Sequence, residues 1–171
     1  MNDDLIMKEE KAYSYAIYLL GLKLRTEGEI KSKLQIKNFK FQIIEQVILR
    51  LKENKYLDDQ RYAEVYLDNL KKYKIFGYYG IKKKLMEKRL PSAIIESVLN
   101  EALSEEEEKK IAKRFVKKFE LENMEYKEKQ KIAQKMKGKG FRMGVIVFYT
   151  SYQKKLTLIM LFHGREKALS T

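Results

Sequence analysis

Apolar side chains recur along this chain in short helical patterns separated by polar links. In the stretch 57–99, the segment Leu57-Asp58-Asp59-Gln60-Arg61-Tyr62-Ala63 comes first, and a lysine-rich connector follows it. Ile81 and Leu85 then stand four residues apart, and a further apolar set ends at Leu99. This spacing is typical of amphipathic helices that direct one face to a core. The stretch therefore predicts one module of three short helices.

The same pattern of apolar positions occurs three times along the chain, at one constant offset. The first two copies match closely, and the third matches more weakly. The matched positions are Ile30, Leu34, Phe39, Ile43, Ile44 and Val47; then Ile81, Leu85, Leu90, Ile94, Ile95 and Val98; then Ile132, Met136, Phe141, Val145, Ile146 and Tyr149. The offset from Ile30 to Ile81 to Ile132 is the repeat period. Each copy has an apolar face that it cannot bury alone, so neighbouring copies stack. The sequence predicts an all-α fold of three tandem three-helix repeats, stacked into an elongated, curved rod.

The repeat pattern divides the chain into five predicted parts. These are an N-terminal lead at 1–11, helical repeats at 12–55, 56–103 and 104–152, and a tail at 153–171. The repeat predicts a last helix over 145–150, although its β-branched and aromatic residues disfavour helix. For the tail three interpretations stay open: a cap on the last repeat, an irregular strand, or a segment unrelated to the repeat.

Helix ends are marked by capping residues. Thr26 with Glu29, and Ser104 with Glu107, have the spacing of capping boxes. One helix-ending position recurs in the three copies, as Asn38, Arg89 and Gly140. Asparagine and glycine suit a positive φ there, whereas an arginine meets a steric cost.

Charge and composition narrow the class of protein. With 37 Lys+Arg against 24 Asp+Glu, the formal net charge is +13, which favours an anionic partner, first of all a nucleic acid or nucleoprotein. The alternative is a lysine-rich solvated surface. The chain has no cysteine, so disulfides and thiolate sites are excluded and a cytoplasmic location is expected. Residues 1–4 are acidic where a signal peptide would be basic.

The chain carries no pattern typical of catalysis. Neither a phosphate-binding loop nor a dinucleotide-binding glycine motif is present, and the single histidine, His163, is interpreted as structural or solvated. Asp58 and Asp59 suit a helix N-cap better than a metal site. The acidic run 105–108 suits a helix N-terminus, with a docking strip as the alternative. We expect no enzyme activity, catalytic residue, metal site or cofactor, and therefore a binding protein.

Four motifs in order resemble the RecX regulatory proteins. They are Arg25-Thr26-x-x-Glu29-Ile30-x-x-x-Leu34; Tyr56-Leu57-Asp58-Asp59-x-Arg61-Tyr62-Ala63; Ile81-x-x-x-Leu85 after a glycine; and Lys139-Gly140-Phe141. The resemblance covers about residues 12–152 and implies three tandem three-helix repeats. It departs from the family where Arg89 replaces the usual glycine of the middle repeat, and where the sequence after Phe141 does not follow the usual closing helix.

The resemblance also implies a function. RecX proteins bind the RecA recombinase, lie in the helical groove of its filament on single-stranded DNA, and modulate it, usually by inhibiting strand exchange and ATP hydrolysis in recombination and DNA repair. Some members also contact DNA directly. We accordingly expect a monomeric protein that has RecA as its partner and no membrane contact. The alternative is a direct nucleic-acid binding module whose helix triplets act like helix-turn-helix units.

The candidate partner and DNA contacts are basic residues of the middle and third repeats. They are Arg61, Lys82, Lys83, Lys84, Lys88, Arg89, Lys135, Lys137, Lys139 and Arg142. For the lysines and for Arg89 and Arg142, the alternative is a solvated face. Arg61 is interpreted either as a partner contact or as a clamp to a neighbouring carboxylate. Tyr78 and Tyr79 either stack on bases or pack between repeats.

Overall fold

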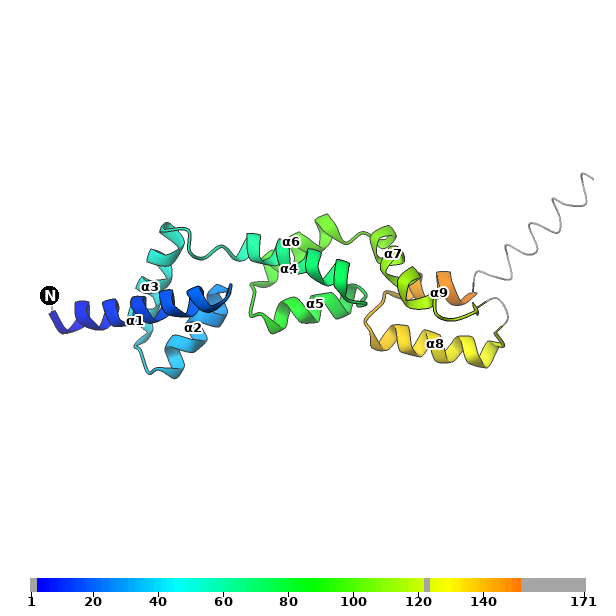
Figure 1. The fold of residues 1–171 in the computed structure, drawn as a ribbon, viewed down its shortest axis with the longest axis horizontal. Helices are drawn as coiled ribbons and strands as arrows, with labels where there is room; N and C mark the ends of the chain where they lie inside the picture. The colour runs from blue at the N-terminus through cyan, green and yellow to red at the C-terminus, as the bar shows by residue number, and fades with distance from the viewer. Residues whose placement is uncertain (1–2, 122–123, 152–171) are drawn as a thin grey trace, which may run out of the picture. The chain divides into compact units, whose positions relative to one another are not determined.

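The computed structural model describes residues 3–121 and 124–151, and this part of the chain contains α-helices and no strand. Its helices, labelled in Figure 1, are α1 (Asp3–Leu22), α2 (Glu27–Ile36), α3 (Phe41–Glu53), α4 (Asp59–Tyr73), α5 (Tyr78–Glu87), α6 (Ser92–Ala102), α7 (Glu105–Val116), α8 (Tyr126–Gly138) and α9 (Met143–Ser151). The predicted all-α fold is confirmed. The number of repeats and their stacking into a rod stay predictions.

The two ends of the predicted division of the chain are the N-terminal lead and the C-terminal tail. Helix α1 already begins at Asp3, so it includes most of the predicted lead at 1–11. The tail at 153–171, with His163 and the apolar run 156–162, lies outside the described residues. Within them, no helix is both long and apolar enough to cross a membrane.

The described helices divide into two compact units. Unit 1 consists of the chain up to Asn69 together with Lys82–Asn100, and unit 2 of Leu70–Ile81 together with the chain from Glu101 onward. Helices α4 and α5 therefore contribute residues to both units.

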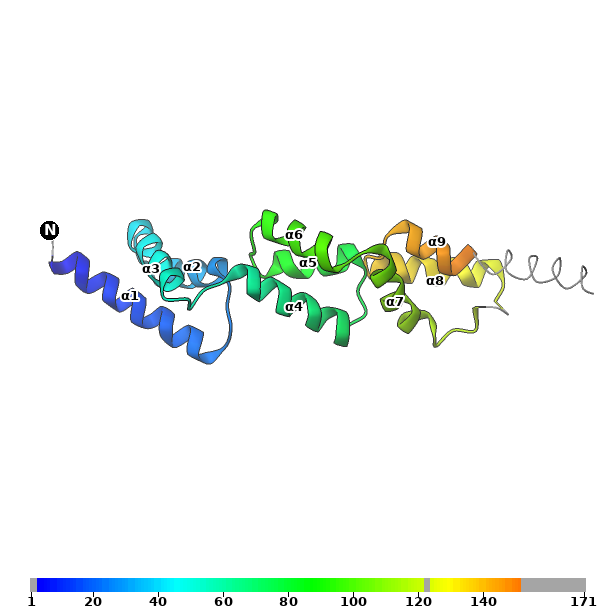
Figure 2. The same cartoon turned by 90° about the horizontal axis from the view of Figure 1, so that it is seen from above.

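The core of unit 1 is built where α1, α2 and α3 pack on one another, as both ribbon views show (Figures 1 and 2). Its buried members are Ala12, Ala16, Leu19, Ile30, Leu34, Ile43, Ile44, Val47, Ile48, Leu51 and Leu57. Helix α3 is strongly amphipathic, since its buried residues recur at helical spacing from Ile43 to Leu51. Packing of this stripe, more than intrinsic propensity, stabilises such short helices.

The core of unit 2 lies where α9 packs on α7 and α8. Phe115 of α7 is buried, and its ring centroid lies 6.4 Å from that of Phe141. Val145 and Ile146 of α9 are buried, while the Tyr149 hydroxyl donates to the Lys109 carbonyl oxygen at 2.9 Å. The helix predicted over 145–150 therefore forms, because burial of its apolar residues outweighs their weak helix propensity.

Helix ends follow the predicted capping residues with one exception. Thr26 and Glu29 form the complete capping box. Ser104 accepts from the Glu107 amide at 3.2 Å, which is half of the predicted box. The recurring helix-ending residues have positive φ in each copy, at 61° for Asn38, 57° for Arg89 and 78° for Gly140.

The repeat period of the sequence also relates helix boundaries. Helices α2, α5 and α8 end at Ile36, Glu87 and Gly138, and helices α3, α6 and α9 begin at Phe41, Ser92 and Met143. Both series advance by one repeat period at each step. The turn between the middle and closing helix therefore recurs at the same position in each copy within the described residues.

Candidate interaction surface

In unit 1, the start of α2 lies against the turn that follows α5. The Thr26 hydroxyl donates to the Lys88 carbonyl oxygen at 2.6 Å. Gly28 faces Arg89 so closely that a Cβ atom on Gly28 would lie 2.5 Å from the Arg89 carbonyl oxygen and 2.6 Å from its Cβ. Only a residue without a side chain fits this approach.

In unit 2, the start of α5 lies against the turn that follows α8 in the same manner. Gly77 donates its N–H to the Lys139 carbonyl oxygen at 3.0 Å, and Tyr79 donates to the Gly140 carbonyl oxygen at 2.9 Å. The start of α5 has close-fitting glycines of its own, since a Cβ on Gly77 would lie 2.2 Å from Phe141 Cα and one on Gly80 would lie 2.3 Å from the Lys139 carbonyl oxygen. Tyr79 and Gly140 are the repeat equivalents of Gly28 and Arg89, so at this one pair of positions the glycine has changed sides. This exchange gives a physical reason for the departure at Arg89, because the missing glycine is supplied by Gly28.

A carboxylate completes the start of the middle helix in each unit. In unit 1, Asp59 Oδ1 accepts from the N–H of Glu27, the first residue of α2, at 2.8 Å. In unit 2, Glu108 Oε1 accepts from the N–H of Tyr78, the first residue of α5, at 2.9 Å. Carboxylates at helix N-termini satisfy free amides and interact favourably with the helix dipole.

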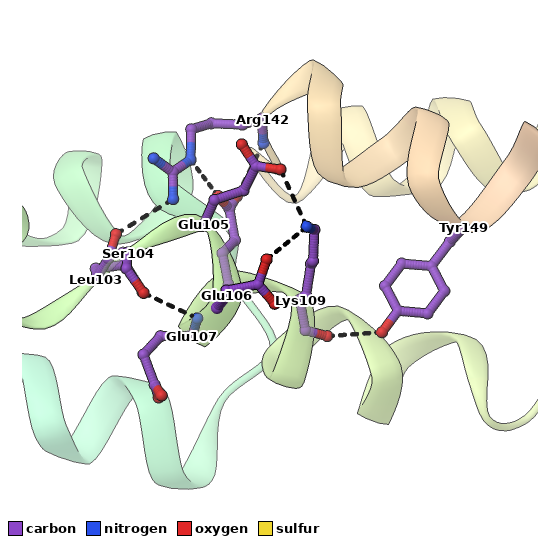
Figure 3. Close-up of polar contacts among 9 residues, drawn as sticks. Leu103, Ser104, Glu105, Glu106, Glu107, Lys109, Arg142 and Tyr149 are labelled. Carbon is purple, nitrogen blue, oxygen red and sulfur yellow. Dashed lines mark hydrogen bonds and ion pairs between the residues drawn. The ribbon is translucent and has the colours of Figure 1, made fainter. Parts of the chain in front are cut away.

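Arg142 neutralises the fully buried carboxylate of Glu108. The Arg142 guanidinium bonds Glu108 Oε2 through Nε and the Leu103 carbonyl oxygen at 3.2 Å, while its backbone N–H donates to Glu108 Oε1 at 2.8 Å. Figure 3 shows Arg142 reaching back to the start of α7, where Leu103 and Ser104 lie. The side chain of Glu108 has no exposed surface. Arg142, a predicted partner contact, is therefore an internal ion-pair residue of unit 2.

The two aspartates at the start of α4 have different tasks. Asp58 Oδ1 accepts from the Arg61 N–H at 2.9 Å and caps α4, as predicted. Asp59 caps α2 through Oδ1, and its Oδ2 atom is buried without a hydrogen-bond partner among the described residues. Burial raises the pKa of Asp59 above its ordinary value of 3.8, and the hydrogen bond from Glu27 opposes this rise.

Lys82 repeats an internal ion pair of the first helices. Lys31 of α2 pairs with Glu45 of α3 at 2.8 Å, and Lys82 of α5 pairs with Glu96 of α6. Both members of the second pair are the repeat equivalents of the first. This recurrence indicates that Lys82 links two helices of its own unit, so its first role is structural.

A lysine near the end of each middle helix lies over an aromatic ring of the helix that precedes it. The ammonium-to-centroid distances are 5.5 Å for Lys37 and Tyr15, 5.4 Å for Lys88 and Tyr66, and 5.9 Å for Lys139 and Phe115. Such cation–π contacts contribute about 0.5–1 kcal/mol at exposed sites. The candidates Lys88 and Lys139 are thus partly used within their own units.

Lys88 is further held by a carboxylate. Its ammonium group lies 3.6 Å from Glu29 Oε1. Partial burial lowers the pKa of Lys88, but the phenol of Tyr62 and the carboxylate of Glu29 raise it by more, so the net shift is upward. Lys88 therefore stays positively charged at neutral pH.

The remaining candidates are more open to solvent, although the Lys135 ammonium lies 5.7 Å from the ring centroid of Phe119. Lys83, Arg89, Lys135, Lys137 and Arg61 are exposed and make no ion pair within the described part of the chain. Lys84, less exposed, pairs with Glu87 at 2.7 Å. The structure gives Arg61 no clamp to a carboxylate in the described ranges, and its interpretation as a partner contact stays a prediction.

The paired tyrosines separate into a packed and an exposed ring. Tyr78 lies under the Arg142 guanidinium, whose Cζ is 4.9 Å from the ring centroid, and meets Tyr79 edge-on at 5.3 Å. Tyr79 remains 60% exposed. Packing thus accounts for Tyr78, while the ring of Tyr79 is accessible to a partner.

Sequence reasoning missed two groups of residues that the structure brings forward. Lys33 and Lys37 are the repeat equivalents of Lys84 and Lys88 in the first copy, so extending the repeat alignment to polar positions identifies them. Glu108 carries no such signal, because its burial depends on Arg142, which is distant in sequence. Among the residues that the structure describes, no cluster of acidic or histidine side chains suits a metal ion.

Comparisons with known proteins give one consistent family. A family model of the first three-helix domain of RecX matches residues 12–51. The chain is 33% identical over 138 residues to the regulatory protein RecX of Oceanobacillus iheyensis, covering 80% of this chain and 51% of the relative. It is 32% identical over 126 residues to the regulatory protein RecX of Streptococcus pneumoniae serotype 19F, covering 74% and 49%. The chain thus spans about half the length of these curated relatives.

Solved structures share the fold. The crystal structure of RecX from Lactobacillus salivarius superposes with a TM-score of 0.78 at 23% identity, covering 87% of this chain and 98% of that one. A second crystal structure, of a regulatory protein RecX, gives 0.73 at 24% identity, covering 85% and 77%. The helical architecture described above is therefore that of the solved RecX structures.

Proposed function

Because this chain belongs to the RecX family of regulatory proteins, we propose that it regulates the RecA recombinase. In this proposal it binds RecA, lies in the groove of the RecA filament on single-stranded DNA, and lowers recombinase and ATPase activity during recombination and DNA repair. Its relatives are named regulatory proteins, which agrees with the prediction that the chain is not an enzyme. We further propose that it acts in the cytoplasm as a monomer.

Family membership carries this proposal, and the surface charges are compatible with it. The chain has a net charge of +13, and cations such as Lys83 and Arg89 in unit 1 and Lys137 in unit 2 are exposed without internal ion pairs among the described residues. Exposed cations of this kind attract acidic protein surfaces and phosphates, and they raise association rates.

Regulation through these residues needs no bond to be made or broken. A protein that occupies the filament groove excludes an incoming duplex from it. If the protein binds one filament state more tightly than another, it also shifts the population toward that state. Inhibition is then steric and allosteric together.

Direct binding to nucleic acid is the second candidate function. The observation that favours it is the recurrence of lysines on the middle helices, at Lys33 and Lys37, Lys84 and Lys88, and Lys135 and Lys139. Phosphate contacts release counterions, so an affinity that depends on them falls steeply with salt.

Binding measured with and without RecA separates the two functions. The change in fluorescence anisotropy of labelled single-stranded DNA is followed on adding this protein, first to bare DNA and then to preformed RecA filaments, over a range of salt concentrations. We expect tight, moderately salt-dependent binding to filaments and weak, steeply salt-dependent binding to bare DNA. Equal affinity for both would favour the nucleic-acid module.

A further inference from the structure

A groove of about 560 Å³ opens on unit 1 beside the candidate residue Arg61. Its walls are the α1–α2 connection at 23–25, the α3–α4 connection at 55–56, and one face of α4. Of the interactions described for the middle helices, those of Lys88 with Tyr66 and Tyr62 reach this groove. All its lining residues belong to unit 1.

The groove is positively charged. Four cations line it, and Asp58 is the one carboxylate among them. Lys23, Lys55 and Arg61 make no ion pair within the described ranges, while Arg25 donates through Nε to the Leu19 carbonyl oxygen at 3.2 Å. Because the four cations outnumber this one carboxylate, whose Oδ1 caps α4 by accepting the Arg61 N–H, the groove as a whole attracts negative charge.

Large apolar side chains stand among these cations. Leu24 is 72% exposed, Tyr56 56% and Val65 47%. Side chains of this size, gathered in one hollow and left in water, mark a surface that another molecule covers. The rings of Tyr62 and Tyr66 also line the groove but are partly covered, Tyr66 by the Lys88 ammonium.

Lys55 occupies its place at a conformational cost. Its φ is 59°, a left-handed conformation that is strained for a residue with a side chain and that glycine adopts freely. Lys55 lies in the turn that follows α3, where Tyr56 donates its N–H to the Leu51 carbonyl oxygen at 2.8 Å. Glycine would serve the turn better, so the lysine side chain is kept for a reason outside the turn.

We propose that this groove binds a peptide segment of a protein partner in which carboxylates flank a large apolar side chain. The carboxylates pair with Arg61, Lys55 and Lys23, and the apolar side chain covers Leu24 and Val65. A nucleic-acid strand fits less well, because successive bases stack on open ring faces. Of the three tyrosines that line the groove, Tyr56 is exposed, while Tyr62 and Tyr66 are partly covered. This proposal does not depend on the proposed regulation of RecA, because peptide binding to the groove can be measured on this protein without RecA filaments.

Fluorescence anisotropy of a labelled short peptide, with glutamate and aspartate around leucine, tests the proposal. The unmodified protein should bind it, and added salt should weaken binding. R61A should weaken affinity about fivefold, as expected for one charged contact. L24S should weaken the affinity about tenfold, since the leucine of the peptide loses the apolar side chain that it covers. K40A is the matched control, because Lys40 is exposed, lies outside the groove and makes no cap hydrogen bond.

K55G separates a binding role from a structural one. Relief of the left-handed strain should leave the melting temperature equal or higher, while affinity for the peptide falls about fivefold. Three results would overturn the proposal: no binding of the peptide, binding unchanged in R61A, L24S and K55G, or binding of an oligothymidine that these variants weaken while the peptide does not bind. The last result would assign the groove to nucleic acid.

Discussion

Glu108 keeps a carboxylate fully buried in unit 2, and three donors make this possible. The backbone amides of Tyr78 and Arg142 bond one oxygen, and the Arg142 guanidinium bonds the other. A buried charge is tolerated when it is paired and hydrogen-bonded, whereas the same charge without its partner is strongly destabilising. At the residue scale, Arg142 therefore contributes to stability before it contributes to any partner contact.

Removing the two partners of this pair should have unequal effects. R142A leaves the Glu108 charge buried and should lower the free energy of unfolding by about 3–5 kcal/mol. E108Q keeps an acceptor for both amides and leaves an arginine whose side chain is 28% exposed to water, so it should cost about 1–2 kcal/mol. Urea denaturation followed by circular dichroism measures both. A larger loss in E108Q than in R142A would contradict this account of the pair.

Asp59 should make the free energy of unfolding depend on pH. Its pKa is raised above 3.8 by burial, so the folded protein disfavours the charged form. The stability contributed by this group is therefore greatest below pH 3.8 and is lost as the pH rises through the raised pKa. D59N keeps the acceptor for Glu27 and has no titrating group.

The difference in unfolding free energy, unmodified protein minus D59N, should thus fall as the pH increases from 3.8 toward neutrality. Urea denaturation at a series of pH values measures it, and the contributions of the other carboxylates cancel in the difference. A difference that rises with pH would show that Asp59 is stabilised as a carboxylate in the folded state.

At the element scale, the contact between a helix start and a left-handed turn recurs with its close-fitting glycines at different positions. Gly28 faces Arg89 in unit 1, and Tyr79 faces Gly140 in unit 2. In unit 2, Gly77 and Gly80 of the helix start also approach the turn closely, so the backbones meet there through glycines on both sides. The pair, and not the single position, is therefore the unit on which substitutions act.

G28A should destabilise unit 1 by about 1–3 kcal/mol, since its Cβ would overlap Arg89. G21A is the matched control, because Gly21 lies in helix α1 with nothing within 4 Å of an added Cβ. That substitution should be neutral or stabilise by up to about 1 kcal/mol. Thermal unfolding of both variants measures the contrast.

The double variant G28A/R89G extends this test. Glycine at position 89 removes the overlapping Cβ but not the carbonyl oxygen, so it should recover part of the loss. The two sites would then show a coupling energy of about 0.5–3 kcal/mol. Additive effects would mean that Gly28 is required for a reason other than Arg89.

Much of the fold could be predicted because its signals are local. The Thr26–Glu29 capping box and the positive φ of Asn38, Arg89 and Gly140 depend on neighbouring residues and on the repeat. The repeat predicts helix α9 against its own composition, and the structure follows the repeat because Val145 and Ile146 are buried. Propensity is the weaker guide where packing decides.

The candidate surface could be predicted less well because contacts distant in sequence decide it. The acidic run 105–108 reads as a uniform cap, yet Glu108 alone is buried against Arg142. Likewise Lys82 and Lys83 are adjacent, but Lys82 pairs with Glu96 while Lys83 is directed to solvent. Charge in a sequence locates cations, and only the packing shows which of them are available to a partner.

At the scale of the whole molecule, this chain is a basic, helical member of the RecX family. In our proposal it acts by binding its partner RecA and occupying the groove of the RecA filament. It matches its curated relatives over about half of their length. The exposed cations Lys83 and Arg89 are the sharpest probes of partner binding, since neither has an internal ion pair among the described residues and glycine at 89 also relieves a positive φ. A variant that changes both should remain folded.

The most direct test is the ATPase rate of the cognate RecA on single-stranded DNA, titrated with this protein. We predict that the unmodified protein and K40A lower the rate at less than one copy per RecA, whereas K83A/R89G requires a higher concentration. Circular dichroism confirms that each variant is folded. An unchanged ATPase rate at a stoichiometric excess of the folded, unmodified protein would contradict the proposal that this chain regulates RecA.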